Sequence, residues 1–367
     1  MFDRRLLYSF DWGFLIIVFT LCFVGGLTLY SVVEAEGFLF NRNIYIKQLI
    51  WYGSGFVIAI IIFFFNYKLF DKLAYIIYGL SIILLICVLI FGKHVAGARR
   101  WIDLGFFSFQ PSEFAKIGLI IPLAKHYAKT SDSEGLTFSK LVKPLTLTLL
   151  PFFLIARQPD LGTAMLLVLI AGSMTIFVKI EKKTFSVLVA AGAVISPIIW
   201  FFLKDYQKLR VFTFLSPERD PLGTGYHIIQ SKIAIGSGML AGKGFMEGKQ
   251  NALLFLPEHH TDFIFSVIAE EWGFIGSIAI LFLFLLLIFW GFNIAYSCRD
   301  SFGAILCVGV IIMITWQVVV NIGMTMGLMP VVGIPLPFIS YGGSSVLTVM
   351  IGVGILLNVS MRGFMYE

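Results

Sequence analysis

Long apolar segments recur along the whole chain of 367 residues, and they constrain its fold more than any other feature. Crossing the hydrocarbon core of a bilayer takes about 20 mostly apolar residues. We count ten candidate spans: residues 11–33, 46–65, 74–92, 112–128, 143–157, 161–179, 185–203, 266–290, 303–325 and 344–360. The fourth and fifth are short and carry basic residues. The predicted fold is an all-α polytopic membrane protein of about ten transmembrane helices, forming one domain over 1–367.

Composition excludes the other fold classes. Apolar residues make up 59% of the chain and charged residues 13%, against about 45–50% and about 25% in soluble domains. Disorder would require low hydrophobicity. The net charge of +6 favours anionic lipid over nucleic acid as a counterpart. The four cysteines lack CxxC spacing, so we predict neither disulfides nor a zinc framework.

The distribution of lysine and arginine in short loops predicts which ends face the cytoplasm. With the N-terminus inside, 13 of the 27 basic residues lie in cytoplasmic segments and 7 in short outer loops, the other 7 lying in residues 204–265. An even number of spans returns the C-terminus to the cytoplasm. Residues 204–265 then form a large extracytoplasmic loop, in which 226–235 has the apolar spacing of an interfacial helix.

Acidic residues and histidines gather just before the eighth span. Three interpretations of residues 256–265 stay open: an N-cap at Thr261 or Asp262, a metal site, or a general base at Asp262. The metal set would be Glu258, His259, His260 and Asp262. Within the span, Glu270 and Glu271 are either hydrated near the interface or face the bundle interior as functional groups.

Three motifs predicted to lie outside the membrane carry charged residues, and two of them also have helix-start signals. Arg99 and Arg100 beside Trp101 suit anion recognition, or a snorkelling anchor. Pro111 and Ser112 indicate a helix start with Ser112 as N-cap, and Glu113 and Lys116, three residues apart, share one face. That pair is either an ordinary ion pair or the lining of a polar cavity. Asp160 is a candidate N-cap or a cation holder.

The segment 333–345 cannot form a regular helix because it holds two prolines and a glycine pair. Non-helical backbone at membrane depth persists where it lines a cavity or is buried in protein. Its free N–H groups, with Ser340, Tyr341 and Ser344, suit an anionic group, although a structural re-entrant turn is the simpler interpretation. Together the motifs predict a lipid phosphate or pyrophosphate substrate at the outer leaflet. A phosphate-binding GxxxxGK[ST] motif is absent from the sequence, so we predict no nucleotide cofactor.

Six motifs resemble the SEDS family of shape, elongation, division and sporulation proteins over nearly the whole chain. They are Ala98-Arg99-Arg100-Trp101, Phe109-Gln110-Pro111-Ser112-Glu113 with Lys116, Gln158-Pro159-Asp160-Leu161-Gly162-Thr163, Gly225-Tyr226-His227-Ile228-Ile229-Gln230-Ser231, His260-Thr261-Asp262-Phe263-Ile264-Phe265 and Pro335-Leu336-Pro337-Phe338-Ile339-Ser340-Tyr341-Gly342-Gly343. Residues 225–230 and 242–245, the latter containing Lys243, are more similar to the elongation branch than to the division branch.

The resemblance implies a bacterial plasma-membrane glycosyltransferase that polymerises lipid II, paired with a class B penicillin-binding protein and other elongation-complex proteins. It implies catalytic roles for Asp262, Glu113 and Lys116. The expected substrate-binding residues are Arg99, Arg100, Trp101, Asp160, Lys243, Ser340, Tyr341 and Ser344. An inverting displacement would use Asp262 as base and cations on the leaving pyrophosphate, with a role for Mg²⁺ or Mn²⁺ left open. A lipid II flippase is the alternative function, and a scaffold for the penicillin-binding protein is a third.

Overall fold

The computed structural model describes residues 10–35, 43–95, 98–103, 105, 108–130, 135–220, 223–248 and 260–362. Each of the ten predicted spans coincides with a helix in this part of the chain, which confirms the predicted fold class. The ten are α2 (Trp12–Ala35), α3 (Asn43–Phe64), α4 (Lys68–Phe91), α5 (Pro111–Thr130), α6 (Phe138–Arg157), α7 (Leu161–Phe177), α8 (Lys182–Phe202), α12 (Ile264–Ser297), α13 (Ser301–Thr325) and α14 (Gly343–Arg362).

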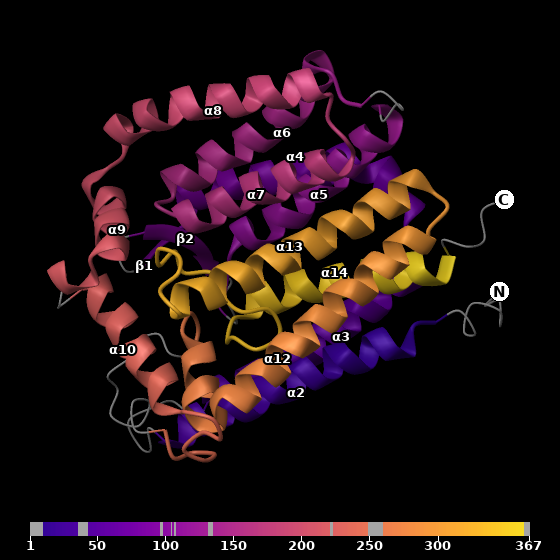
Figure 1. The fold of residues 1–367 in the computed structure, drawn as a ribbon. Helices are drawn as coiled ribbons and strands as arrows, with labels where there is room; N and C mark the ends of the chain where they lie inside the picture. Colours follow the sequence, from indigo (N-terminus) through magenta and orange to yellow (C-terminus); the bar gives the residue numbers. More distant parts are fainter. Residues whose placement is uncertain are drawn as a thin grey trace.

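These helices run side by side in one bundle, with α13 and α14 in its middle (Figure 1). Seven of the described helices are long and apolar enough to cross a membrane by length and composition. The 17-residue α7 is apolar but shorter, and α5 has acidic Glu113 in its first turn and basic Lys129 in its last. Most residues of α5 are nevertheless buried, as are about half of those in α7, so both helices pack against the rest of the bundle.

Helix α12 extends over 34 residues and is kinked at Gly273, which has a positive φ of 65°. The turn that follows α10 (Thr224–Ser237) packs into the kink. Phe274 N–H donates to the Met239 carbonyl at 2.9 Å. A Cβ on Gly273 would lie 2.2 Å from the Gly242 nitrogen, so only glycine fits this approach. The kink separates a short arm, which follows Asp262, from the long remaining part of α12.

Short elements cover one end of the bundle (Figure 1). The sheet β1 (Lys93–Val95), β2 (Ala98–Asp103) and β3 (Ser108–Phe109) is antiparallel in the order β1-β2-β3. The sequence did not predict this sheet. Helix α9 (Asp205–Leu215), the 3-10 helix η2 (Pro217–Arg219) and α10 follow. The helix predicted over 226–235 is confirmed as part of α10, which runs across the bundle end.

The segment between α13 and α14 confirms the predicted non-helical backbone for residues 333–342, whereas residues 343–345 are the first residues of α14. Residues 326–342 contain turns and bends but no helix. This segment is packed in protein, with Leu336 1% and Ile339 0% exposed. Tyr52 on α3 donates its hydroxyl to the Phe338 carbonyl at 2.6 Å. The segment therefore forms part of the core at the same end of the bundle as the sheet and α10 (Figure 1).

The start of α2 and the end of α14 lie together at the opposite end of the bundle (Figure 1). Asp11, just before α2, accepts hydrogen bonds from Trp290 at 3.2 Å and from Ser360. This proximity agrees with an even number of crossings. The four cysteines are free thiols.

Candidate active site

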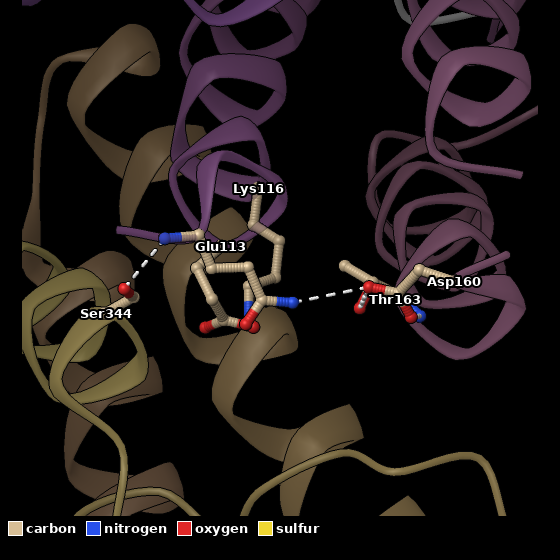
Figure 2. Close-up of polar contacts among 6 residues, drawn as sticks. Glu113, Lys116, Asp160, Thr163 and Ser344 are labelled. Atoms are coloured by element: carbon tan, nitrogen blue, oxygen red, sulfur yellow. Dashed lines mark hydrogen bonds and ion pairs between the residues drawn. The ribbon is translucent and has the colours of Figure 1, made fainter. Parts of the chain in front are cut away.

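The first turn of α5 carries a buried ion pair. Lys116 Nζ lies 2.7 Å from Glu113 Oε2, and the two residues are 0% and 4% exposed. Both side chains point the same way from α5 because they are three residues apart, and Figure 2 shows them between Ser344 and Asp160. Desolvating two charges is costly, so a pair in this interior needs either a structural or a functional reason.

Gln110, the residue before α5, connects this pair to two other helices. Its backbone N–H donates to Ser344 Oγ at 3.0 Å, at the start of α14. Its side-chain amide donates to Asp160 Oδ2 at 3.3 Å, at the start of α7. The prediction that Ser112 caps α5 is wrong: the helix begins at Pro111, and the buried Ser112 hydroxyl has no hydrogen-bond partner among the described residues.

Asp160 is the N-cap of α7, as one interpretation of its position predicted. Its carboxylate accepts from Thr163 N at 3.3 Å and from the Thr163 hydroxyl at 2.9 Å (Figure 2). Arg100 on β2 reaches the same turn, where its guanidinium donates to the carbonyls of Gln158 and Pro159. The sheet thereby places one cation beside the Asp160 turn.

Two neighbouring residues of the non-helical segment bring Asp160 and Asp262 into one region. The Val332 carbonyl oxygen would lie 2.4 Å from a Cβ on Gly162, at the start of α7. Asp262 Oδ2 would lie 3.1 Å from a Cβ on Gly333, whose φ is positive at 71°. Consecutive Cα atoms are only about 3.8 Å apart. The starts of α7 and α12 therefore meet across Val332 and Gly333.

Asp262 is half-buried in the turn before α12. The prediction that Thr261 or Asp262 caps this helix is wrong, because Phe263 holds the N-cap position and no side chain caps it. The backbone carbonyl of Asp262 instead accepts from Asn321 Nδ2 at 2.9 Å. The Asp262 carboxylate is thus not used as a helix cap.

Arg210 on α9 is a functional candidate that the sequence analysis missed. Burial, followed by the positive charge of Arg100, lowers the pKa of its guanidinium, whereas Tyr206, Asp160 and Asp262 raise it. One partly desolvated cation therefore interacts electrostatically with both candidate carboxylates. Nothing in the sequence separated Arg210 from the other basic residues of the loop 204–265.

The other predicted substrate-binding residues lie on β2, in the segment before α14 and at the start of α14. Arg99 is exposed on β2, and Trp101 is half-buried there, paired in register with Lys93. The Ser344 hydroxyl accepts the Gln110 bond. Ser340 is 3% exposed and its hydroxyl joins Leu336 N to the Thr261 carbonyl, while Tyr341 N–H donates to the His260 carbonyl at 3.0 Å.

Lys243 belongs to a second polar cluster further along α12. Its ammonium lies 2.6 Å from Glu270 Oε1, and the neighbouring Glu271 accepts from Ser31 of α2. Glu270 and Glu271 are 1% and 2% exposed, so the interpretation that they are hydrated at the interface is wrong. Both face the bundle interior. The structure does not place Lys243 beside Glu113, Lys116 or Asp160.

The described residues contain no group of three or more His, Cys, Asp and Glu that could hold a metal ion. Glu258 and His259 of the predicted metal set lie outside the described residues. The described carboxylates Glu113 and Asp160 are engaged by Lys116, Gln110 and Thr163. These two carboxylates are thus occupied by protein donors. A role for Mg²⁺ or Mn²⁺ stays a prediction.

These features define a multi-pass membrane protein with a charged, largely buried site at one end of its helix bundle. The family model of FtsW, RodA and SpoVE, described as "Cell cycle protein", matches residues 11–363. The chain belongs to this family, which is the SEDS family that the motifs indicated.

Relatives and solved structures agree with this assignment. The chain is 44% identical over 309 residues to the peptidoglycan glycosyltransferase MrdB of Escherichia coli K12, covering 84% of this chain and 83% of the relative. It is 35% identical over 427 residues to the peptidoglycan glycosyltransferase RodA of Treponema pallidum, covering 96% and 98%. The chain is accordingly a glycosyltransferase.

Its fold matches that of Thermus thermophilus rod shape determining protein RodA with a TM-score of 0.72 and 30% identity, covering 97% of this chain and 98% of that one. A chain from a structure described as "Structural coordination of polymerization and crosslinking by a peptidoglycan synthase complex" matches with a TM-score of 0.83 and 32% identity, covering 97% and 99%.

Proposed function

We propose that the protein polymerises lipid II into β-1,4 glycan strands at the outer face of the bacterial plasma membrane, and serves cell elongation. One observation carries the proposal. The turns that carry Asp160 and Asp262 meet across Val332 and Gly333, and the Arg100 guanidinium donates to the carbonyls of the Asp160 turn. Both carboxylates also raise the pKa of Arg210 on α9, against the effects of burial and Arg100. Such a site combines an acceptor for a proton with positive charge for a phosphate. The names of the relatives support the glycosyltransferase class and the peptidoglycan precursor as substrate.

The chemistry requires two functions from the protein. A β-1,4 bond formed from an α-linked pyrophosphate donor inverts the anomeric carbon in one displacement. A base must take the proton of the acceptor 4-hydroxyl as its oxygen attacks, and the bond to the pyrophosphate breaks with both electrons going to the leaving oxygen. General-base catalysis contributes roughly 10²–10⁴-fold to such a step.

We propose that Asp262 accepts the proton of the 4-hydroxyl, because its half-buried carboxylate is not a helix cap and lies against the backbone of Gly333. Arg100 and Arg210 stabilise the charge that develops on undecaprenyl pyrophosphate, since preorganised cations act strongly in a partly dehydrated site. Asp160 holds the start of α7 in place. Glu113 and Lys116 form the buried floor of the site next to Gln110.

The proposal includes orientation and a partner. The end of the bundle that carries the sheet, α9 and α10 faces the extracytoplasmic side, and both termini are cytoplasmic. The matched chain from a complex that coordinates polymerization and crosslinking supports a transpeptidase partner of the class B penicillin-binding type. Elongation-complex proteins are the further expected partners.

The test is polymerisation of labelled lipid II by the purified protein with its cognate transpeptidase. Asp262→Asn keeps the side-chain shape but removes the base, and we expect a loss of roughly 10²–10⁴-fold. Asp262→Ala should behave in the same way. Asp205→Ala, at an exposed aspartate that begins α9, is the matched control and should keep the wild-type rate.

Normal polymerisation by Asp262→Asn would refute the base assignment. If wild type makes no glycan but moves lipid II across vesicle membranes, the flippase becomes the better function.

A further inference from the structure

Three successive backbone carbonyls around Asp262 are each held by a donor from another element. The Tyr341 N–H donates to the His260 carbonyl at 3.0 Å. The Ser340 hydroxyl donates to the Thr261 carbonyl at 2.5 Å. The Asn321 amide on α13 donates to the Asp262 carbonyl at 2.9 Å. The turn before α12 is thus held by hydrogen bonds from residues that are distant in the sequence.

Asn321 has a special position among these donors. It is 0% exposed, and the same Nδ2 atom also donates to the Ile334 carbonyl at 2.7 Å. Ile334 follows Gly333, whose backbone the Asp262 carboxylate faces. One buried amide therefore links the turn that bears the carboxylate to the segment against which that carboxylate lies.

We infer that Asn321 is a positioning residue for Asp262. It has no exposed surface with which to touch a substrate. Its effect is to fix the distance between Asp262 and the Val332–Gly333 backbone, and hence the direction in which the carboxylate points. A misplacement of about 1 Å at a reacting group can cost 10²-fold in rate. The inference rests on the proposed role of Asp262 as general base.

The competing explanation is that Asn321 serves stability alone, and the chain contains a matched control for it. Asn358 on α14 is also 0% exposed, and its Nδ2 likewise donates to two carbonyls, those of Ile62 at 2.6 Å and of Phe65. It lies toward the end of the bundle opposite to Asp262. Removing either amide deletes two bonds from Nδ2 to backbone carbonyls, and Asn358→Ala also deletes the bond that its Oδ1 accepts from Arg362 at 3.0 Å. Only the Asn321 pair adjoins the candidate base.

The experiment compares Asn321→Ala, Asn358→Ala and Ser340→Ala in the full-length protein with its transpeptidase partner. For each variant, the thermal unfolding midpoint, kcat and KM for lipid II polymerisation are measured. We expect Asn321→Ala to lower kcat by about 10- to 100-fold with little change in KM. Asn358→Ala should lower the thermal midpoint by a similar amount and leave kcat near wild type.

An equal kcat loss in Asn321→Ala and Asn358→Ala would overturn the inference, as would a rise in KM alone. If Asn321→Ala does not fold, Ser340→Ala decides, because it removes the neighbouring bond to the same turn. A fall in kcat there supports positioning, whereas unchanged kcat refutes it. Asp262→Asn is assayed in parallel. Activity of that variant refutes the base assignment, while an Asn321 variant that behaves like the Asn358 control refutes only the positioning role.

Discussion

Variants of the buried ion pair of α5 can show whether the pair serves the stability of the fold or the activity of the enzyme. Lys116 Nζ and Glu113 Oε2 are 2.7 Å apart, with both side chains almost fully buried. At an effective dielectric constant of about 20, two unit charges at this distance attract by about 6 kcal/mol. Desolvation costs several kcal/mol for each ion, so the net contribution of the pair to folding is small.

Removing only one partner of the pair should destabilise the fold strongly. Lys116→Met leaves Glu113 buried without its cation, and breaking a buried pair costs about 3–5 kcal/mol. Replacing both residues, as in Glu113→Gln combined with Lys116→Met, removes both charges and keeps similar volumes. The double variant should therefore unfold within about 1–2 kcal/mol of wild type.

The polymerisation activity of these variants should not follow their stability to unfolding. If the pair forms the floor of the active site, the double variant is folded but polymerises lipid II far more slowly than wild type. Thermal unfolding and assembly with the transpeptidase measure the first property, and glycan ladders on a gel measure the second. A double variant as unstable as Lys116→Met would refute the electrostatic reasoning. A stable double variant with wild-type activity would reduce the pair to a structural role.

Arg210 and Gly162 lead to two further predictions. Arg210→Ala should lower kcat/KM roughly 10- to 100-fold, because a hydrogen bond to a charged group contributes about 1.5–3 kcal/mol, while Lys208→Ala on the same helix should have little effect in the same kinetic assay. Gly162→Ala would place a Cβ 2.4 Å from the Val332 carbonyl oxygen, so we expect about 1–3 kcal/mol of destabilisation and reduced activity. Gly172→Ala, at a position on α7 with open space around its Cβ direction, should be neutral or stabilising in thermal unfolding, and equal behaviour of the two glycine variants would contradict the packing argument.

The helices were predictable from sequence because their signal is local. Each span is a run of apolar residues, and a window of about 20 residues contains the whole requirement for crossing a bilayer. The short span over α5 was predictable for the same reason, although it carries Glu113 and Lys116. The sheet was missed because two of its strands, of three and two residues, are shorter than the roughly four to eight residues over which alternation is recognised. The six-residue strand Ala98–Asp103 does not alternate apolar and polar residues.

The site was only partly predictable because its geometry is non-local. Glu113, Asp160 and Asp262 were identified as candidates from their motifs. Their meeting depends on Gln110, which bonds to residues 50 and 234 positions away, and on Val332 and Gly333. Apolar periodicity contains no information on which helices are neighbours. Arg210 and Asn321 were missed for this reason, since their importance comes only from what they contact.

Helix register explains why two aspartates with similar sequence contexts have different local geometries. Both Asp160 and Asp262 precede an apolar helix, and the sequence allowed each to be its N-cap. Asp160 stands directly before Leu161, the first residue of α7, so its carboxylate is occupied by Thr163. Asp262 stands one residue further out, behind the N-cap Phe263. The Asp262 carboxylate is therefore not the cap of α12, and donors from Asn321, Ser340 and Tyr341 hold the turn that carries it. A carboxylate that does not cap its helix suits the proton transfer that we propose for Asp262. The residues that hold its turn are distant in sequence, so the motif identified the residue but not its geometry.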